Sequence, residues 1–563
     1  MKFTLVAAAI VAWFLTTFIG RAGNWPAWRG PEGTGVTAEK NLPLTWSTNQ
    51  NVRWRVELPD PGNSSPIVWG QKVLVTQAVQ KENRRTLMCF DKNSGKLLWQ
   101  SGIVYTNKEA THDSNPYCAG SPVTDGKAVY VCFGSPGVYA YDFNGKELWH
   151  RDLGQLDHMF GNSVSPILYR DLCILNFGPD PKARLIALRK KDGQTAWEVQ
   201  PPKPEQKEHL LALAGPGMFV APEMVSQGDK NADEKLSRQE FAALADVWFD
   251  KVDTERSGQL RETNFIEKLE QVLPPPEGRR SPAKAIGPVI FAAADADKDA
   301  TMTRAELKSA FEKWFAEWDD ESGGAIDENE IRVGLHAAMP GGGAGGTATA
   351  TRDVTGSWST PLIVNAQGKE ELIINFAHRL AGHDPQTGQQ LWISKGLGGS
   401  IYSTPLWGDG VLVAVSSGVG NGNAIAVKPG RRGQLGDQER LWRLDRVKGA
   451  IVSGVIHDGH VYLISADGFA ECFELKTGNK LWTERLKGPT SRNSSWSSML
   501  LAGDKIYIPN QSGDVFVLRA SPKFEQLACN SVRESTNASL AASDGALFLR
   551  TDKALWSFAE SKQ

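Results

Sequence analysis

The chain has 563 residues, with 62 Lys and Arg, 64 Asp and Glu, 56 Gly, 30 Pro, 19 Trp and 6 Cys. A formal net charge of −2 excludes a globally basic nucleic-acid-binding protein, and a hydrophobic content of 41% excludes wholesale disorder. The length allows several domains, or one large repeat fold with an added module. The many glycines and tryptophans indicate short strands joined by tight turns, as in repetitive all-β folds.

The N-terminus has the layout of a secretory signal peptide over residues 1–23. One lysine precedes an uncharged apolar stretch from Phe3 to Ile19, and small residues follow, with cleavage expected near Ala22 or Gly23. The alternative is an uncleaved membrane anchor, but the stretch is at the short limit for spanning a bilayer. We therefore expect an exported protein, periplasmic or extracellular, with no stable membrane insertion after cleavage.

The six cysteines are widely scattered, at Cys89, Cys118, Cys132, Cys173, Cys472 and Cys529. None forms a CxxC motif, which excludes a zinc ribbon, a thioredoxin-like site and a c-type haem site. We expect buried thiols, with a cross-strand disulfide between Cys118 and Cys132 as the alternative.

A turn followed by a tryptophan recurs along the chain. Its copies are DKNSGKLLW ending at Trp99, DFNGKELW at Trp149, KKDGQTAW at Trp197, DPQTGQQLW at Trp392 and LKTGNKLW at Trp482, with a looser copy ending at Trp442. Each predicts two strands joined by a tight turn whose glycine takes a positive φ. The tryptophan on the second strand is expected to pack between neighbouring units.

A run of small residues, usually ending in Ser/Thr-Pro, precedes each turn by about 25 residues. Its copies end at Pro66, Pro122, Pro166, Pro361 and Pro405, with degenerate copies at Gly454, Met499 and Ser539. A spacing of 44 residues, from Pro122 to Pro166 and again from Pro361 to Pro405, accommodates four short strands, which is one blade of a β-propeller. Eight copies predict eight blades. The last lacks an outer strand, and NVRWRVEL around Trp54 is expected to supply it and to close the ring.

These repeats resemble the pyrrolo-quinoline-quinone-like (PQQ repeat) family, over about residues 24–200 and 352–560. The opening WPAWRGPEGTGV is also similar to exported bacterial members. The resemblance implies an eight-bladed all-β propeller, and some members are quinone-dependent dehydrogenases while others are envelope scaffold proteins. The fold therefore leaves the function open.

One repeat interval is too long, at 195 residues from Pro166 to Pro361. The excess, residues 201–351, is flanked by PPKP and GGGAGGTATAT, which are typical of linkers. Residues 201–340 contain 17 Lys and Arg against 27 Asp and Glu, a local charge of −10 that leaves +8 for the rest of the chain. We expect an inserted acidic all-α module after the third blade, between propeller segments 24–200 and 352–563.

The insertion contains four loops of twelve residues, at 229–240, 253–264, 295–306 and 319–330, here named loops one to four. Oxygen ligands at positions 1, 3, 5, 7, 9 and 12 are the EF-hand pattern for Ca²⁺, and the loops resemble that family. An apolar residue at position 8 of every loop predicts short β-bridges between paired loops. Loops one and three start 66 residues apart, as do loops two and four, which indicates an internal duplication into two pairs of loops.

The four loops differ in quality. Ala300 and Glu234 replace the turn glycine in loops three and one, which we expect to weaken calcium binding without abolishing it. Loop two ends in Asn264, which cannot supply a bidentate carboxylate, so we expect calcium in loops one and three, with loop four as a further candidate. The candidate metal ligands are Asp229, Asn231, Asp233, Lys235, Ser237 and Glu240 in loop one, Asp295, Asp297, Asp299, Thr301, Thr303 and Glu306 in loop three, and Asp319, Glu321, Ala325, Asp327 and Glu330 in loop four.

Two functions from different classes follow from the sequence. The first hypothesis is a calcium-binding scaffold of the envelope or the exterior that binds a protein or polymer on its propeller face. The alternative is a PQQ-dependent oxidoreductase, although the adjacent Cys-Cys pair that the resemblance implies for a quinone site is absent from this sequence. A hydrolase or lyase is a third option. Polar and aromatic residues that a common mouth would bring together are His112, Asp113, Asn115, His158, His378, Arg379, His383, Trp358, Tyr402 and Trp496.

Overall fold

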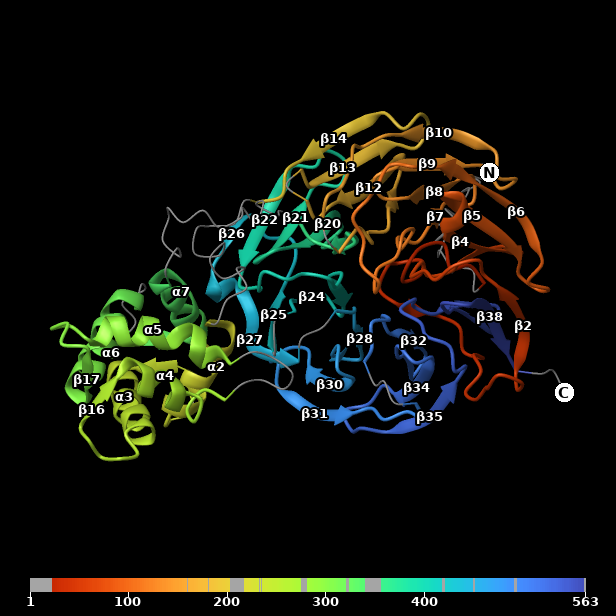
Figure 1. Cartoon of the computed structure of the whole chain (residues 1–563). Helices are drawn as coiled ribbons and strands as arrows, with labels where there is room; N and C mark the ends of the chain where they lie inside the picture. The colour runs from red at the N-terminus through yellow and green to blue at the C-terminus, as the bar shows by residue number, and fades with distance from the viewer. Residues whose placement is uncertain are drawn as a thin grey trace, which may run out of the picture.

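The computed structural model is a ring of β-sheets with a helical segment beside it (Figure 1). The structure describes residues 23–158, 160–180, 182–202, 217–231, 233, 235–274, 281–319, 324–339, 356–417, 421–448, 451–490 and 494–560. Residues 1–22 of the expected signal peptide, and most of both expected linkers, lie outside this part of the chain. None of the described helices is long and apolar enough to cross a membrane.

Eight mostly antiparallel sheets of four or five strands form the blades, and the eight-bladed propeller predicted from the repeats is confirmed. Blade 1 consists of β3 (Ile67–Trp69), β4 (Lys72–Val79), β5 (Arg84–Asp91) and β6 (Leu97–Val104). Blade 2 consists of β7 (Val123–Thr124), β8 (Val129–Cys132), β9 (Val138–Tyr141) and β10 (Glu147–Arg151). Blade 3 consists of β11 (Ile167–Tyr169), β12 (Leu172–Phe177), β13 (Arg184–Arg189) and β14 (Thr195–Val199).

The other blades follow the helical segment. Blade 4 consists of β19 (Leu362–Ala366), β20 (Lys369–Phe376), β21 (Arg379–His383) and β22 (Gln390–Lys395), with β26 (Gly433–Leu435) added in parallel. Blade 5 consists of β23 (Leu406–Gly408), β24 (Val411–Val415), β25 (Asn421–Val427) and β27 (Arg440–Lys448). Blade 6 consists of β28 (Val455–His457), β29 (His460–Ile464), β30 (Phe469–Glu474) and β31 (Lys480–Arg485). Blade 7 consists of β32 (Leu500–Ala502), β33 (Lys505–Pro509), β34 (Asp514–Arg519) and β35 (Gln526–Ser531), with β1 (Val36–Thr37) parallel to β32.

The two ends of the chain close the ring in blade 8. Its first three strands are β36 (Ala541–Ser543), β37 (Ala546–Arg550) and β38 (Ala554–Ala559), and β2 (Val52–Glu57) pairs antiparallel with β38. The predicted closure is therefore confirmed. Because β2 pairs with β38, the strand from the C-terminal part of the chain is not left as a sheet edge.

The repeated tryptophans pack between neighbouring blades, as predicted, and at six of the eight interfaces they hydrogen-bond to the next blade. In six interfaces of the described chain the indole N–H donates a hydrogen bond of 2.7–3.2 Å to a carbonyl of the next blade's turn. The pairs are Trp54 with Lys92, Trp99 with Phe143, Trp149 with Lys190, Trp197 with Pro385, Trp442 with Leu475 and Trp482 with Ser521. Trp392 differs, because its indole donates within its own blade to the buried carboxylate of Glu371.

The turn glycine is required for the contact between the turn and the tryptophan of the preceding blade. Gly388 has a φ of +75°, and a Cβ at this position would lie 2.6 Å from the ring of Trp197. Both the backbone conformation and the closeness of the indole therefore demand a residue without a side chain.

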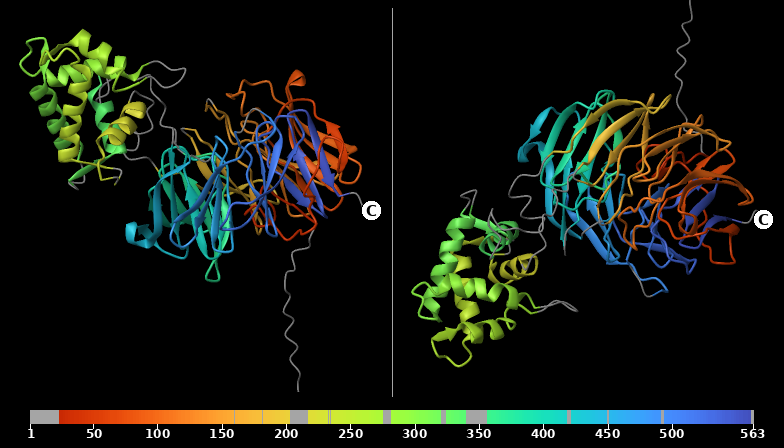
Figure 2. Two further views of the ribbon diagram at one scale, coloured as in Figure 1. Left: turned by 90° about the horizontal axis from the view of Figure 1, so that it is seen from below. Right: turned by 45° about the horizontal axis from the view of Figure 1, so that its top comes forward.

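The helical segment contains six α-helices in its described part. They are α2 (Gly217–Gly228), α3 (Arg238–Val252), α4 (Glu262–Leu269), α5 (Pro282–Ala294), α6 (Arg304–Trp318) and α7 (Glu328–Ala338). They share one core, in which Phe241 and Trp248 of α3 lie 5.1 and 5.6 Å from Phe311 of α6. Figure 2 shows this body to one side of the ring in both further views.

Two short ladders join the four loops. β15 (Lys235–Ser237) of loop one pairs with β18 (Ala325–Asp327) of loop four, and β16 (Gln259–Arg261) of loop two pairs with β17 (Thr301–Thr303) of loop three. The apolar position 8 lies at the centre of each ladder, which confirms the predicted bridges. The pairs join the two halves of the duplication, rather than two loops of the same half.

We predict that the contact between the Trp197 indole and the turn of the next blade, here called the clamp, contributes measurably to stability, and Gly388 is the position that tests it. Gly388→Ala places a methyl group against Trp197 and adds backbone strain, which together are expected to cost about 2–4 kcal/mol. Gly410→Ala is the matched control, because Gly410 has a φ of +76° but nothing within 4 Å of an added Cβ. Thermal unfolding should show a clearly larger fall in Tm for Gly388→Ala, and equal falls would contradict the clamp.

Candidate functional site

A ring of hydroxyl groups surrounds the propeller axis. Each blade contributes one Ser or Thr from the small-residue run that precedes its inner strand: Ser65, Ser121, Ser165, Thr360, Thr404, Ser453, Ser498 and Ser539. In seven steps the backbone N–H of one residue donates to the hydroxyl oxygen of the next, at 2.8–3.3 Å, and the seventh returns from Ser539 to Ser65. In the eighth step the Thr404 hydroxyl donates to the carbonyl oxygen of Thr360. We name these eight residues the hydroxyl ring.

The N-terminal segment crosses the axis on one side of the hydroxyl ring. Trp25 exchanges two backbone hydrogen bonds of 2.8 Å with Val68 of blade 1, and Pro26 accepts one from blade 2. Beyond Arg29, the carbonyl of Gly35 accepts a bond of 2.8 Å from Leu501 of blade 7. Because blades 2 and 6 are opposite each other in an eight-bladed ring, a segment that also contacts blade 6 spans the channel.

Arg29 holds that segment to blade 6. Its guanidinium donates to the carbonyl oxygens of Ser453 and Gly454, at 3.1 and 2.6 Å, and to those of Gly33 and Thr34. Complete burial lowers the pKa of Arg29 to about 9, so the side chain is still a cation at neutral pH. Four carbonyl oxygens replace the water that this cation loses.

A cavity of about 330 Å³ lies on the other side of the hydroxyl ring. Its wall is a second ring, formed by the residue two positions before each hydroxyl: Asn63, Ala119, Ser163, Trp358, Tyr402, Ile451, Trp496 and Asn537. All eight line the cavity, and we name them the wall ring. Trp28, from the crossing segment, closes the cavity at its far end.

The wall ring has two unlike sides. Blades 4 to 7 contribute Trp358, Tyr402, Ile451 and Trp496, and the rings of Trp358 and Tyr402 are stacked with centroids 4.9 Å apart. Blades 8, 1, 2 and 3 contribute small or amide side chains. The cavity therefore has an aromatic wall facing a polar wall.

Two loops form the rim. His112 and Phe160 come from the connections into blades 2 and 3, with their rings 5.2 Å apart. Nδ1 of His112 lies 2.8 Å from the hydroxyl of Ser114. Asn115 donates from its amide to the carbonyl of Phe160 at 2.6 Å, which ties the two loops together.

The structure thus brings together five of the residues singled out in the sequence, namely His112, Asn115, Trp358, Tyr402 and Trp496. His158 packs edge-on against Trp358 at 4.8 Å behind this wall, and burial lowers the pKa of its imidazole. Asp113, His378, Arg379 and His383 are absent from the residues that line the cavity. His383 is buried, with Nδ1 3.0 Å from the carbonyl of Gly388.

Among the residues that the structure describes, those that line the cavity include no Asp, Glu, Lys or Arg. Burial raises the pKa of the Tyr402 phenol, which keeps it neutral. All six cysteines are free thiols, so the Cys118–Cys132 disulfide considered as an alternative is absent, and five of the six are buried, as expected. The chemistry of the cavity is that of stacking and neutral hydrogen bonding.

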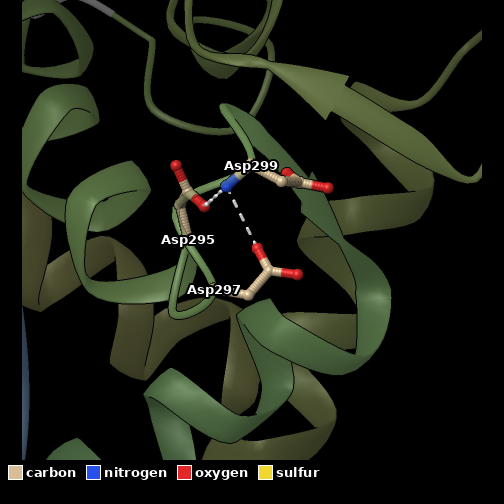
Figure 3. Close-up of side chains that lie close together, drawn as sticks. All are labelled: Asp295, Asp297 and Asp299. Carbon is tan, nitrogen blue, oxygen red and sulfur yellow. Dashed lines mark hydrogen bonds between the residues drawn. The ribbon is translucent and has the colours of Figure 1, made fainter.

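The second candidate site is loop three of the helical segment. Asp295, Asp297 and Asp299 each present a carboxylate oxygen, and these oxygens lie within 4.8 Å of one another (Figure 3). The N–H of Asp299 donates to the carboxylates of Asp295 and Asp297, at 3.1 and 3.2 Å. The hydroxyl and N–H of Thr301 lower the pKa of the Asp299 carboxyl, which favours its ionised form.

The rest of loop three keeps the geometry of the motif. Glu306 accepts from the N–H and the hydroxyl of Thr303 at 2.8 Å, in a capping box that begins α6. Ala300, at the position that favours glycine, has a φ of +66°, so the expected backbone strain is present.

The structure describes part of loops one and four. In loop one the N–H of Asp233 reaches the side chains of Asp229 and Asn231, at 3.3 and 3.0 Å, and Glu240 caps α3 together with Ser237. Glu321 of loop four lies outside the described residues. Each of the further predicted ligands is placed in its loop: Lys235, Asp319, Ala325, Asp327 and Glu330.

The comparisons place the chain in a family. The family model described as outer membrane protein assembly factor BamB matches residues 45–216 and 376–553, more than half of the chain. The chain belongs to this family. No curated protein matches the sequence.

Several solved structures are similar to the BamB-family chain. One is BamB from Moraxella catarrhalis, at 11% identity and a TM-score of 0.48, covering 91% of this chain and 98% of that one. The computationally designed Ika8 protein has 9% identity and a TM-score of 0.46, covering 91% and 100%. A europium-containing methanol dehydrogenase has 10% identity and a TM-score of 0.45, covering 95% and 98%.

We predict that the hydroxyl ring contributes measurably to stability at Ser498. Ser498→Ala leaves the buried N–H of Ser453 without its acceptor, which should cost about 1–3 kcal/mol. Its neighbour Ser497 is the control, because its buried hydroxyl has no hydrogen-bond partner among the described residues, so Ser497→Ala should be neutral or stabilising. If denaturant unfolding gives the same loss for both variants, the ring bond contributes nothing.

Proposed function

We propose that this protein is an exported binding scaffold of the cell envelope, whose binding face is the cavity mouth of the propeller. The observation that carries the proposal is the neutral lining of the cavity, in which the described residues provide aromatic and amide side chains and no Asp, Glu, Lys or Arg. Such a lining can bind a neutral ligand, but it supplies neither a charged catalytic pair nor the ligands of a hard cation.

A polyanionic quinone does not fit this lining. Its carboxylates would be taken out of water without an Arg or Lys to pair with them, which is strongly unfavourable in an enclosed site. A calcium ion beside such a quinone would also need carboxylate ligands to balance its charge, and the described residues of the cavity offer only amide and hydroxyl oxygens. The PQQ-dependent oxidoreductase therefore stays the alternative function, and no step is derived through the quinone.

The histidine-based hydrolase or lyase also lacks support in the cavity. His112 has a hydroxyl neighbour in Ser114, but no carboxylate among the lining residues orients the imidazole. Nucleophilic catalysis of the serine type relies on such a third group.

The family supports an envelope location and a protein or polymer partner, because its description names an assembly factor of outer membrane proteins. The insertion replaces the connection between β14 and β19. Connections of the same kind supply His112 and Phe160 to the rim, so the inserted module, residues 201–351, is attached on the side of the mouth. A role in shaping access to the mouth follows from that attachment.

We further propose that the inserted module is of the EF-hand type and binds Ca²⁺. In loop three the side chains of Asp295, Asp297, Asp299 and Glu306 and the carbonyl of Thr301 would hold the ion, and their oxygen-only chemistry suits a hard cation. A bound ion would neutralise a cluster of carboxylates whose mutual repulsion destabilises the loop. Loop one is the second expected site.

Calcium is therefore expected to raise the Tm of the protein, and EDTA to reverse the gain. Asp297→Ala should reduce the gain, because it removes position 3 of loop three. Glu255→Ala, at position 3 of loop two, is the matched control and should leave the gain unchanged, since loop two lacks the terminal carboxylate. A Tm indifferent to calcium and to EDTA would contradict the calcium site.

Dye-linked oxidation of alcohols and sugars tests the alternative function. Protein incubated with PQQ and calcium is expected to show no dye reduction and no quinone absorbance after desalting. Retained quinone together with substrate-dependent dye reduction would overturn the scaffold proposal in favour of the dehydrogenase.

A further inference from the structure

We propose that the cavity binds the end of a neutral saccharide chain, a proposal that rests on the binding-scaffold function above and names its ligand class. Four features of the cavity support this ligand class: the two-sided wall ring, the lack of charged side chains among the described lining residues, the donors of the hydroxyl ring, and the crossing segment at the far end. Each of these observations excludes a different class of ligand.

The two-sided wall matches the two-sided chemistry of a sugar ring. A pyranose has flat apolar faces made of C–H groups and a polar edge of hydroxyls. Trp358 and Tyr402 form a stacked aromatic pair, and Trp496 lies on the same side of the wall beyond Ile451, so an apolar face can stack on either aromatic surface. The polar edge would then face Asn63 and Asn537 across the cavity.

Two of the three lining asparagines, Asn63 and Asn115, are positioned to accept hydrogen bonds, whereas Oδ1 of Asn537 already accepts one from the amide of Gln511 at 2.9 Å. In the described contacts, Asn63 uses its amide N–H₂ to donate to the carbonyl of Ser114 at 2.9 Å, which fixes the orientation of the amide. Its Oδ1 is left to accept a bond at the wall, and the same holds for Asn115 at the rim, whose amide nitrogen donates to Phe160. Fixed acceptors of this kind suit hydroxyl donors.

The hydroxyl ring supplies the complementary donors. Six serine hydroxyls of the ring line the cavity, and each already accepts an N–H from the neighbouring blade. The set is Ser65, Ser121, Ser165, Ser453, Ser498 and Ser539. Each hydroxyl hydrogen can therefore turn toward a ligand oxygen. A purely apolar ligand would leave the hydrogens of these serine hydroxyls without a hydrogen-bond partner, which disfavours its binding.

The uncharged lining and the crossing segment at the far end exclude further classes of ligand. The described part of the lining contains no cation, so an acidic glycan or a nucleotide would lose its hydration there without compensation. Trp28 and the crossing segment close the far end, so a polymer cannot thread through and only a terminal unit can enter. The volume of about 330 Å³ is at the lower end of the range for small-molecule sites, ~300–1,000 Å³, and suits a short saccharide terminus.

The test is binding of the calcium-loaded full-length protein to an array of neutral and acidic glycans, followed by calorimetry with the strongest neutral oligosaccharide. Wild type is expected to bind neutral glycans. Trp496→Ala removes one stacking face and should weaken binding about tenfold, equivalent to ~1.4 kcal/mol, while Trp496→Phe should retain part of it.

The matched control is Trp407→Ala. Trp407 is a half-buried tryptophan of β23 that does not line the cavity, so this variant should bind as wild type does. Asn63→Leu should weaken binding with little loss of Tm, because it removes the acceptor at the opposite wall. Circular dichroism and Tm identify any variant that fails to fold, and the variants that fold then show whether the cavity binds the saccharide.

Three results would overturn the saccharide proposal. The first is the absence of any glycan bound above the level of Trp496→Ala, and the second is binding of acidic glycans alone. The third is capture of peptides with aromatic ends, lost in Trp496→Ala, which would assign the cavity to a protein partner. Capture of such peptides would contradict the saccharide proposal but not the scaffold function. Quinone uptake would contradict both, so failure of the one can be told from failure of the other.

Discussion

The backbone N–H groups at the propeller axis have no sheet partner, and the hydroxyl ring is what satisfies them. At this point eight chain segments converge, each about to enter its inner strand, and a buried N–H without an acceptor costs free energy. One Ser or Thr per blade resolves the conflict by accepting from the preceding blade in seven of eight steps. The same bond also fixes how each blade is rotated about the axis, because donor and acceptor belong to different blades.

The cavity is a consequence of that constraint. Once the hydroxyl at each repeat is fixed, the side chain two positions earlier points to the axis on the open side, and these eight positions are free to differ. Their identities divide the wall into an aromatic half and a polar half. A second belt at the periphery, where indoles clamp the next blade's turn, holds the ring while the wall varies. Stability and recognition are thus assigned to different positions of one repeat.

Much of this architecture was predictable from the sequence, and the features that were not predictable have physical causes. Period and turn chemistry predict eight blades, and the unpaired eighth blade predicts the role of β2, because both depend on local patterns repeated many times. Trp358, Tyr402 and Trp496 each lie two positions before a hydroxyl of the ring. This common offset is visible in the sequence, and it is what places the three aromatic residues in one wall. The pairing of loops one with four and two with three was not predictable, because an apolar position 8 in every loop is compatible with any pairing. Helix packing across the two halves decides it.

The account assigns recognition to the wall ring, and hydrogen–deuterium exchange tests that assignment most directly. Exchange would be measured on the calcium-loaded protein with and without the neutral oligosaccharide that binds most tightly. The account predicts slower exchange in the segments that contain the wall aromatics, 357–360, 401–404 and 495–498, with unchanged exchange in the outer strands β6, β14 and β31. Slowing confined to those outer strands or to the helices α2–α7 would contradict it.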